Sequence, residues 1–273
     1  MIKLLLTDVD GTLIGSGSTI HLRVLAALEM ARGAGLHLAI CTGRPLFSRA
    51  KEYAELVSPN EPHIFQNGAH VARLDGTPIH QSILARHAYQ ELVALSRRTG
   101  IALEVYTASQ CFVELHTEIA GEHQRLIGIT AQHRDLLSVG EPVLRAQWVN
   151  TVADEAMLLS AMRSIPDIQF SSAGTPDMPD ALFTSVTRAG TSKLEGAKAL
   201  ANHYGVTIAE TMMVGDGDND VDLLEAVGLG VAMGNASPAA LKAAKTRVGH
   251  VNTGGLADAI YLALETLKPE VEA

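Results

Sequence analysis

Residues 3–12 read Lys-Leu-Leu-Leu-Thr-Asp-Val-Asp-Gly-Thr, a short apolar run followed at once by two aspartates. The run from Ile2 to Thr7 has the length and apolar content of a buried strand, and the Asp-Gly pair is typical of a turn. Side chains two residues apart near a strand end point the same way, so Asp8 and Asp10 can face one small volume. Ligands of open α/β sheets bind at this carboxyl edge of the strands. Taken alone, the pattern fits a solvated turn as well as it fits a functional site.

Strand and helix signals alternate on both sides of this run. They predict helices over 21–32 and 47–57 and strands over 36–41 and 64–66, with a hairpin turn at Asp75-Gly76. After residue 190 they predict a helix over 192–204, a strand over 211–214, a helix through 223–224, a strand over 229–233 and a last helix with Leu256 and Ile260 on one face. Repeated strand and helix units favour an α/β fold, a doubly wound, Rossmann-like parallel sheet.

The segment 84–187 has a different pattern. It predicts helices over 84–98, 117–127 and 156–165, a hairpin at Ser109-Gln110, a strand over 148–152 and further strands up to Val186. No glycine-rich phosphate turn occurs among them. We therefore expect a first domain formed by 1–83 and 188–273, with 84–187 inserted as a separate α+β module.

Composition limits the classes of partner. The 273 residues carry 21 Lys and Arg against 30 Asp and Glu, a formal net charge of −9, which is a poor match to nucleic acid. Two cysteines cannot form a disulfide framework, and no run approaches the roughly 18 to 20 apolar residues of a membrane span. We expect a cytoplasmic protein with no nucleic-acid or membrane partner, and no feature of the sequence sets an oligomeric state. A phosphate ligand would have to be small and held by local cations or a metal ion.

A second acidic cluster, Gly-Asp-Gly-Asp-Asn-Asp at 215–220, directly follows the short apolar strand 212–214. A calcium loop counted from Asp216 would need its glycine and its bidentate glutamate where Val221 and Val227 stand, so that alternative fails. Hard oxygen ligands from two strand ends suit Mg²⁺, which accepts one or two carboxylates together with substrate phosphate oxygens.

Two weaker signals occupy comparable places. Thr42-Gly43 follows the second strand, where a hydroxyl and the N–H groups of a helix start could bind phosphate oxygens, although ordinary turn and cap chemistry is the more frequent explanation of such a pair. Lys193 opens a helix, where the helix dipole disfavours a cation. Its position indicates either an anionic partner or a surface lysine.

In this order the motifs resemble the haloacid dehalogenase superfamily, specifically its Cof-type sugar-phosphatase branch. The resemblance covers nearly the whole chain and rests on segments 8–13, 42–45, 66–69, 192–193, 215–220 and 232–236. It implies that the segment 84–187 is the α/β cap of that branch.

The resemblance also implies a role for each motif. Asp8 would be the nucleophile that becomes an aspartyl phosphate, and Asp10 the general acid and base. Mg²⁺ would be held by the Asp8 side chain, the Asp10 backbone carbonyl and Asp216. The expected phosphate contacts are Thr42, Gly43, Lys193 and Asn219, and Asp220 would orient Lys193 or a metal-bound water.

We therefore expect a Mg²⁺-dependent phosphatase acting on a small phosphorylated metabolite such as a sugar phosphate, with substrate choice in the inserted module. Polar residues that could read the substrate there are Glu114, His116, His123 and Arg125. One alternative is a phosphomutase that retains the same intermediate, which release of inorganic phosphate would distinguish. Another is a non-enzymatic phospho-acceptor resembling a receiver domain, which does not need an acid–base residue such as Asp10.

Overall fold

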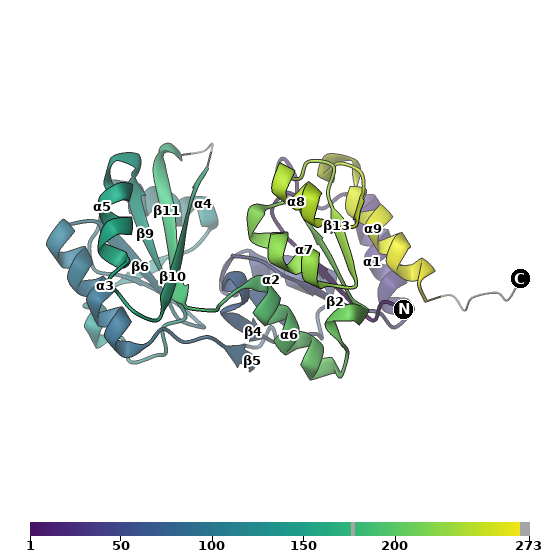
Figure 1. Ribbon diagram of the computed structural model, residues 1–273, viewed down its shortest axis with the longest axis horizontal. Coiled ribbons are helices and arrows are strands. Elements are labelled where there is room, and N and C mark those ends of the chain that lie inside the picture. Colours follow the sequence, from purple (N-terminus) through teal and green to yellow (C-terminus); the bar gives the residue numbers. More distant parts are fainter. Residues whose placement is uncertain (176–177, 268–273) are drawn as a thin grey trace, which may run out of the picture. The chain divides into compact units, whose positions relative to one another are not determined.

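The computed structural model describes residues 1–175 and 178–267 (Figure 1). Contacts between residues divide the chain into two compact units. The first unit consists of Met1–Gly43, Ala50–His80 and Ser192–Ala273, and the second of Arg44–Arg49 and Gln81–Thr191. The predicted boundaries at 84 and 187 lie a few residues inside the second unit, and the short segment 44–49 groups with it.

The first unit is built on a five-stranded parallel sheet in the order β14-β13-β12-β1-β2. Its strands are β1 (Leu4–Thr7), β2 (His37–Ile40), β12 (Thr211–Gly215), β13 (Leu229–Ala232) and β14 (Thr246–Arg247). The strand order reverses between β1 and β12, where Thr7 lies opposite Val214. Such a switch point opens a crevice at the carboxyl ends of the strands.

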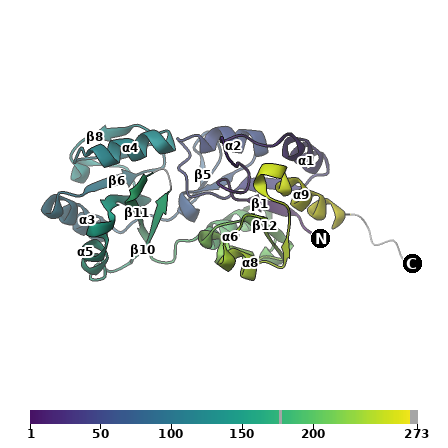
Figure 2. The same cartoon turned by 90° about the horizontal axis from the view of Figure 1, so that it is seen from above.

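Helices cover both faces of this sheet, so the expectation of a doubly wound fold is confirmed. Figure 2 shows α1 (Leu22–Gly33) and α9 (Gly255–Glu265) on one face and α6 (Lys193–Tyr204) and α8 (Pro238–Ala243) on the other. Helix α7 (Val221–Ala226) packs on β12 and β13, and α2 (Ala50–Val57) packs on β2. Buried Leu4 and Leu6 of β1 meet Ala197 and Leu200 of α6 in one apolar core.

The third predicted strand, 64–66, does not join the parallel sheet. Instead β3 (His63–Phe65), β4 (His70–Ala72) and β5 (Pro78–Gln81) form a separate three-stranded sheet, linked to β2 by a single parallel bridge between Cys41 and Ile64. Near this bridge the Ile40 N–H donates to Nδ1 of His63 (3.0 Å), a side-chain acceptor, whereas the Thr42 N–H donates to the Ile64 carbonyl (2.9 Å). The predicted turn at Asp75-Gly76 is confirmed, since the Arg73 N–H donates to the Thr77 carbonyl across it.

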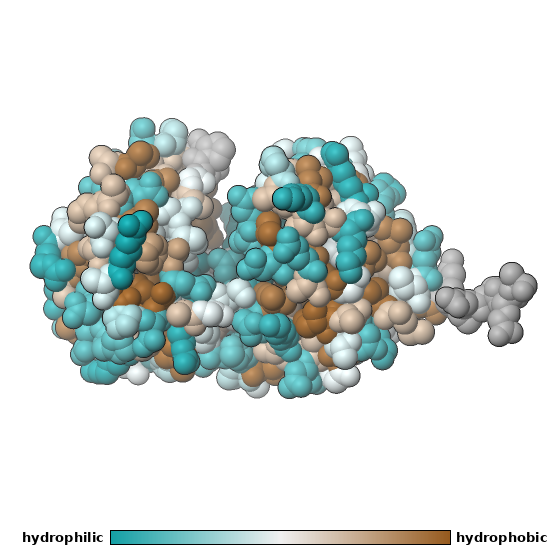
Figure 3. All heavy atoms as spheres, viewed as in Figure 1, coloured by the Kyte–Doolittle hydropathy of each residue, from teal (hydrophilic) through white to brown (hydrophobic). Residues whose placement is uncertain are grey.

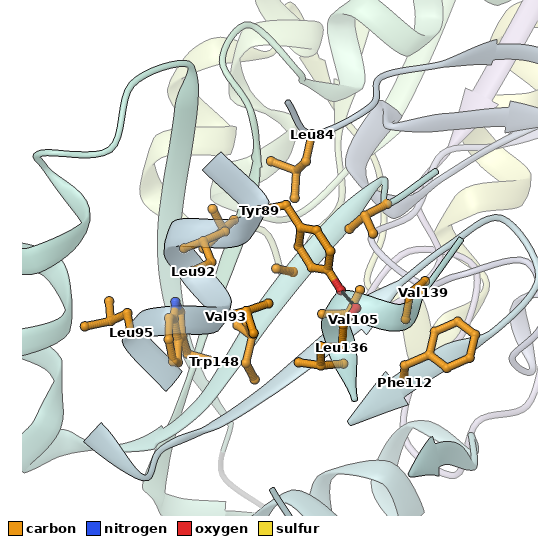
Figure 4. Close-up of a cluster of buried hydrophobic side chains, with 14 of the residues drawn as sticks. Leu84, Tyr89, Leu92, Val93, Leu95, Val105, Phe112, Leu136, Val139 and Trp148 are labelled. Carbon is orange, nitrogen blue, oxygen red and sulfur yellow. Dashed lines mark hydrogen bonds between the residues drawn. The ribbon is translucent and has the colours of Figure 1, made fainter. Parts of the chain in front are cut away.

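The second unit contains a six-stranded mixed sheet in the order β10-β11-β9-β6-β7-β8. Its elements are α3 (Arg86–Thr99), β6 (Ala102–Tyr106), β7 (Cys111–Val113), α4 (Glu118–Ile127), β8 (Ala131–His133), β9 (Arg145–Thr151), α5 (Val152–Met162), β10 (Ile168–Thr175) and β11 (Met178–Arg188). Helices α3 and α5 pack on one face of the sheet around fully buried Trp148. Figure 4 shows Leu92, Val93 and Leu95 of α3 in the same apolar cluster as Val105 of β6.

Several predicted bounds need correction. Helix α2 begins at Ala50 instead of residue 47, because Ser48 turns back and donates through both its N–H and its Oγ to the Pro45 carbonyl. Helix α5 begins four residues early, at Val152, and is capped by Thr151 and Asp154. The short helix α8 was not predicted.

None of the helices in the described part of the chain is long and apolar enough to cross a membrane. On the face shown in Figure 3, hydrophilic and hydrophobic residues are interspersed over both units.

Candidate functional site

The two acidic loops lie side by side at the switch point of the first unit. The Asp8 N–H donates to the Val214 carbonyl (2.9 Å), which extends the β1–β12 pairing by one residue. β12 ends at Gly215, so Asp216 follows its strand as directly as Asp8 follows β1. The parallel register thus brings together two loops that are more than 200 residues apart in the sequence.

Lys193 joins the carboxylates of these loops. Its Nζ lies 2.5 Å from Oδ1 of Asp8 and 2.6 Å from Oδ1 of Asp220. The side chain is fully buried, which excludes the interpretation of Lys193 as a surface lysine. Burial by itself would lower the pKa of Lys193, but the carboxylates of Asp220 and Asp8 outweigh it and hold this pKa above its ordinary value.

Asp220 uses both of its oxygens within the protein. Oδ1 accepts the hydrogen bond from Lys193, while Oδ2 accepts from the backbone N–H groups of Asp216 (3.1 Å) and Gly217 (3.0 Å). Gly215 makes room for this carboxylate, because a Cβ there would lie 2.5 Å from Oδ2. Asp220 therefore fixes the loop that carries Asp216 and holds Lys193 at the same time.

Asp216 is positioned by two residues to which the sequence analysis gave no role. Thr12 Oγ1 donates to its Oδ1 (2.8 Å), and Asn235 Nδ2 donates to its Oδ2 (3.3 Å) and to the Gly11 carbonyl (2.7 Å). A Cβ on Gly11 would lie 2.1 Å from Oδ2 of Asp216, and its φ of +82° also favours glycine. Thr12 and Asn235 both stand in the motifs quoted above, which is the signal that could have identified them.

Ligand atoms of Asp8, Asp216 and Asp220 all lie within 4.8 Å of one another. Burial raises the pKa of the Asp8 carboxyl to about 8, although Lys193 acts in the opposite sense. Burial likewise raises the pKa of Asp216 to about 6, against the hydrogen bond from Thr12. Within the described residues Asp216 has no ion pair, so the cluster holds more negative charge than Lys193 balances. The carboxylates of Asp8 and Asp216 are hard oxygen donors that suit a divalent cation, whereas both oxygens of Asp220 already accept hydrogen bonds within the protein.

Asp10 lies in an exposed turn that the Gly11 N–H closes on the Ile14 carbonyl (2.9 Å). Its charge contributes to the raised pKa values of both Asp8 and Asp216, as expected for a nearby carboxylate. Unlike Asp8, Asp10 is open to solvent, so a substrate or a water molecule can reach it.

The residues predicted to contact phosphate lie around a turn over 66–68. Thr42 is buried, and its carbonyl accepts from the Asn67 N–H (3.0 Å). Asn219 is exposed, and its Nδ2 donates to Oδ1 of Asn67 (3.2 Å). No helix starts at Gly43, since α2 begins seven residues later, so the expected helix N-terminus is not part of this site.

Three histidines of the described residues are buried. His63 and His70 are buried in the first unit. In the second unit, His123 is buried and pairs through Nδ1 with Glu104 (2.9 Å), so it is a poor candidate for reading a substrate. Glu114 forms an ion pair with Arg97 (2.9 Å), and Arg125 is exposed.

A family model for haloacid dehalogenase-like hydrolases matches residues 5–260. The chain belongs to this family. Its motifs and relatives place it among the Cof-type members of the family, and the expected resemblance is confirmed.

Curated relatives include phosphatases matched over nearly their whole length. The chain is 28% identical over 272 residues to a putative phosphatase, YxeH, of Bacillus subtilis, covering 96% of this chain and 98% of that protein. It is 27% identical over 259 residues to the HMP-PP phosphatase of Klebsiella pneumoniae, covering 87% and 86%. The chain is also 30% identical to a chloroplastic endoribonuclease YBEY of Arabidopsis thaliana. That match includes 93% of this chain but only 45% of the length of the endoribonuclease.

A solved structure gives the same result for the fold. A phosphatase of the haloalkanoate dehalogenase superfamily from Bacteroides thetaiotaomicron, BT1666, is 26% identical, with a TM-score of 0.81 over 96% of this chain and 95% of that chain. These findings identify the chain as a phosphoric monoester hydrolase. Family hydrolases generally use a divalent metal, which agrees with the aspartate cluster.

Proposed function

We propose that the chain hydrolyses a small phosphomonoester with Mg²⁺ through an aspartyl phosphate on Asp8. The observation that carries this proposal is the buried Lys193 ammonium between Asp8 and Asp220. It holds a carboxylate oxygen in a fixed position at the carboxyl end of β1 and supplies positive charge beside it. Attack by a carboxylate on a phosphate dianion needs such positioning and neutralisation more than it needs a base.

In the first half-reaction, an Asp8 oxygen forms a bond to phosphorus while the bond to the ester oxygen breaks. Asp10 gives its proton to the departing alcohol. In the second half-reaction, Asp10 takes a proton from water as the water oxygen attacks phosphorus, and the bond to Asp8 breaks to give inorganic phosphate and the free carboxylate. The solvent-exposed turn of Asp10 suits this exchange with substrate and water.

Phosphate oxygens would be bound by Thr42, Gly43, Lys193 and Asn219. A cationic group and neutral donors are the groups that can bind a dianion beside several carboxylates. Lys193 is fully buried between Asp8 and Asp220, so its charge is available to a phosphoryl group that is bound beside Asp8.

Mg²⁺ would be held by the side chains of Asp8 and Asp216 and by the backbone carbonyl of Asp10. When bound, it supplies charge neutralisation for the phosphoryl group. Asp220 is not proposed as a direct ligand, because Lys193 and two backbone N–H groups occupy its oxygens. Its proposed role is to orient Lys193 and the loop of Asp216.

The proposed substrate is a small polar phosphomonoester such as a sugar phosphate. Relatives are named as phosphatases of small compounds, among them HMP-PP and 5-amino-6-(5-phospho-D-ribitylamino)uracil. The proposed phosphoryl site has no group that would distinguish one alcohol from another, so we assign substrate choice to the second unit. His116→Ala and Arg125→Ala should change relative kcat/KM values across a panel of phosphorylated metabolites while activity on a small aryl phosphate is kept. Equal losses on every substrate would contradict this assignment.

The proposal is tested by measuring release of inorganic phosphate from the same panel with Mg²⁺. We expect turnover by the wild-type chain, its loss in excess chelator, and near-complete loss in Asp8→Asn with an unchanged circular dichroism spectrum, because an amide is a far poorer nucleophile. Isomerisation of a sugar phosphate without phosphate release would instead indicate a mutase. A single phosphorylation event without turnover would indicate a phospho-acceptor.

A further inference from the structure

The turn over 66–68 has an unusual backbone. Gln66, Asn67 and Gly68 follow one another with φ angles of 52°, 54° and 92°, all in the left-handed region. Glycine adopts this region readily and asparagine tolerates it, but for glutamine it is unfavourable. Backbone strain of this kind persists only where the surroundings impose it, and it is frequent at functional sites.

Helix α6 packs closely against this turn. A Cβ on Gly68 would lie 2.0 Å from the Ser192 carbonyl oxygen, and one on Gly196 would lie 2.8 Å from the Cα of Gly68. The turn therefore packs directly on the first turn of α6, the turn that begins with Lys193. The same packing that seats Lys193 fixes the position of Asn67.

Asn67 contacts three of the other residues proposed to bind phosphate, Thr42, Gly43 and Asn219. Its N–H donates to the Thr42 carbonyl (3.0 Å), and its Oδ1 accepts from Asn219 Nδ2 (3.2 Å). A Cβ on Gly43 would lie 3.1 Å from its Oδ1 and 3.2 Å from its Nδ2, so the amide rests on the backbone of Gly43. No described residue accepts a hydrogen bond from Nδ2, and the side chain is partly exposed.

We propose that Asn67 is itself a phosphoryl-binding residue, with Nδ2 donating to a phosphoryl oxygen while Oδ1 holds Asn219 in place. This rests on the proposed function and adds a residue to the phosphoryl site. A neutral donor suits this place, because it binds a dianion without forming an ion pair with the neighbouring aspartates. The strained turn presents the donor and leaves it without a partner among residues 1–175 and 178–267.

Two variants distinguish the donor role of Nδ2 from the acceptor role of Oδ1 toward Asn219. The probe is inorganic phosphate in the presence of Mg²⁺. Asn67→Gly removes the amide but suits a left-handed backbone, so we expect its melting temperature to be retained and its affinity for phosphate to fall about tenfold, the effect of one hydrogen bond to a charged group. Asn67→Asp keeps an acceptor for Asn219 but replaces the donor by a negative oxygen, so its affinity should fall further. Calorimetric titration and competitive inhibition by phosphate measure both.

Asp167→Gly is the matched control, because Asp167 is an exposed left-handed residue (φ 60°) in the second unit, where no phosphate contact is proposed. It should bind phosphate as the wild type does. Wild-type affinity in both Asn67 variants would overturn the inference, and retained affinity in Asn67→Asp alone would reduce Asn67 to a positioning residue for Asn219. Unfolding of both variants would show a purely structural role. A wild-type chain that neither binds phosphate nor releases it from esters would instead refute the proposed function.

Discussion

Asp220→Asn should destabilise the first unit strongly although it changes one atom. The asparagine side chain has one oxygen, whereas Asp220 accepts from Lys193 through Oδ1 and from two backbone N–H groups through Oδ2. Whichever way the amide turns, its NH₂ group faces another donor. Gly215 lies against the carboxylate, so the side chain has no room to move away.

The magnitude follows from the burial of the pair. Removing one partner of a buried ion pair lowers the free energy of unfolding by about 3–5 kcal/mol. The lower end of this range applies here because Lys193 still forms its ion pair with Asp8. For a unit of this size, a loss of about 3 kcal/mol lowers the melting temperature by roughly 6–12 °C. Differential scanning calorimetry without added metal measures this shift directly.

Asp218→Asn is the matched control in the same loop. Asp218 is exposed and accepts a hydrogen bond from Ser237 Oγ (2.5 Å), which an amide oxygen can also accept. The free energy of unfolding of Asp218→Asn should differ from that of the wild type by no more than about 0.5 kcal/mol. If Asp220→Asn melted at the same temperature as Asp218→Asn, the bonds to Lys193 and the loop amides would not hold the site together.

Three further predictions concern the metal site and pH. Gly11→Ala should lower stability by more than about 1 kcal/mol and weaken Mg²⁺ binding, because its Cβ would lie 2.1 Å from Asp216 Oδ2; unchanged titration curves would contradict this. Asp216→Ala should weaken Mg²⁺ affinity in calorimetric titration more than Asp220→Ala does. The reverse order would indicate that Asp220 is the direct ligand and Asp216 the orienting residue. Burial lowers the pKa of His63 to about 4, so its neutral form stabilises the fold fully above pH 6.5, and that stability is lost as pH falls towards 4. Between pH 6.5 and pH 4, the free energy of unfolding measured in urea should therefore fall by about 3 kcal/mol less in His63→Gln than in the wild type. An equal fall in both proteins would contradict the lowered pKa of His63.

The sequence predicted the sheet and the places of its aspartates because both depend on local patterns. A short apolar run that ends in Asp8 defines a strand and its carboxyl end, and a second run before Asp216 does the same. Parallel pairing then brings the two ends together without further information. The sequence could not show that β3 pairs with β4 and β5 in a separate sheet, or that the ring of His63 accepts a hydrogen bond from the Ile40 N–H.

The remaining site residues depend on contacts between distant parts of the chain. Thr12 contacts Asp216 across 204 positions, and Lys193 contacts Asp8 across 185. Nothing local in the sequence marks Thr12, and the unfavourable place of Lys193 at a helix start does not say which anion lies beside it, so only the packed fold shows the partner of each. Asn67 was part of a quoted motif, but its role depends on a strained turn packed on α6, which no local pattern predicts.

The most direct test of the mechanism is to trap the phosphorylated enzyme in the Asp10→Asn variant. An aryl phosphate has a leaving group that needs no proton, so Asp8 can still accept the phosphoryl group, whereas the attack of water lacks its base. After brief reaction with such an ester and Mg²⁺, intact-protein mass spectrometry should show one added phosphoryl group, and peptide mapping should place it on Asp8. The double variant Asp8→Asn/Asp10→Asn should show none. Phosphate release by Asp8→Asn at the wild-type rate, with no phosphorylated species in Asp10→Asn, would contradict the account.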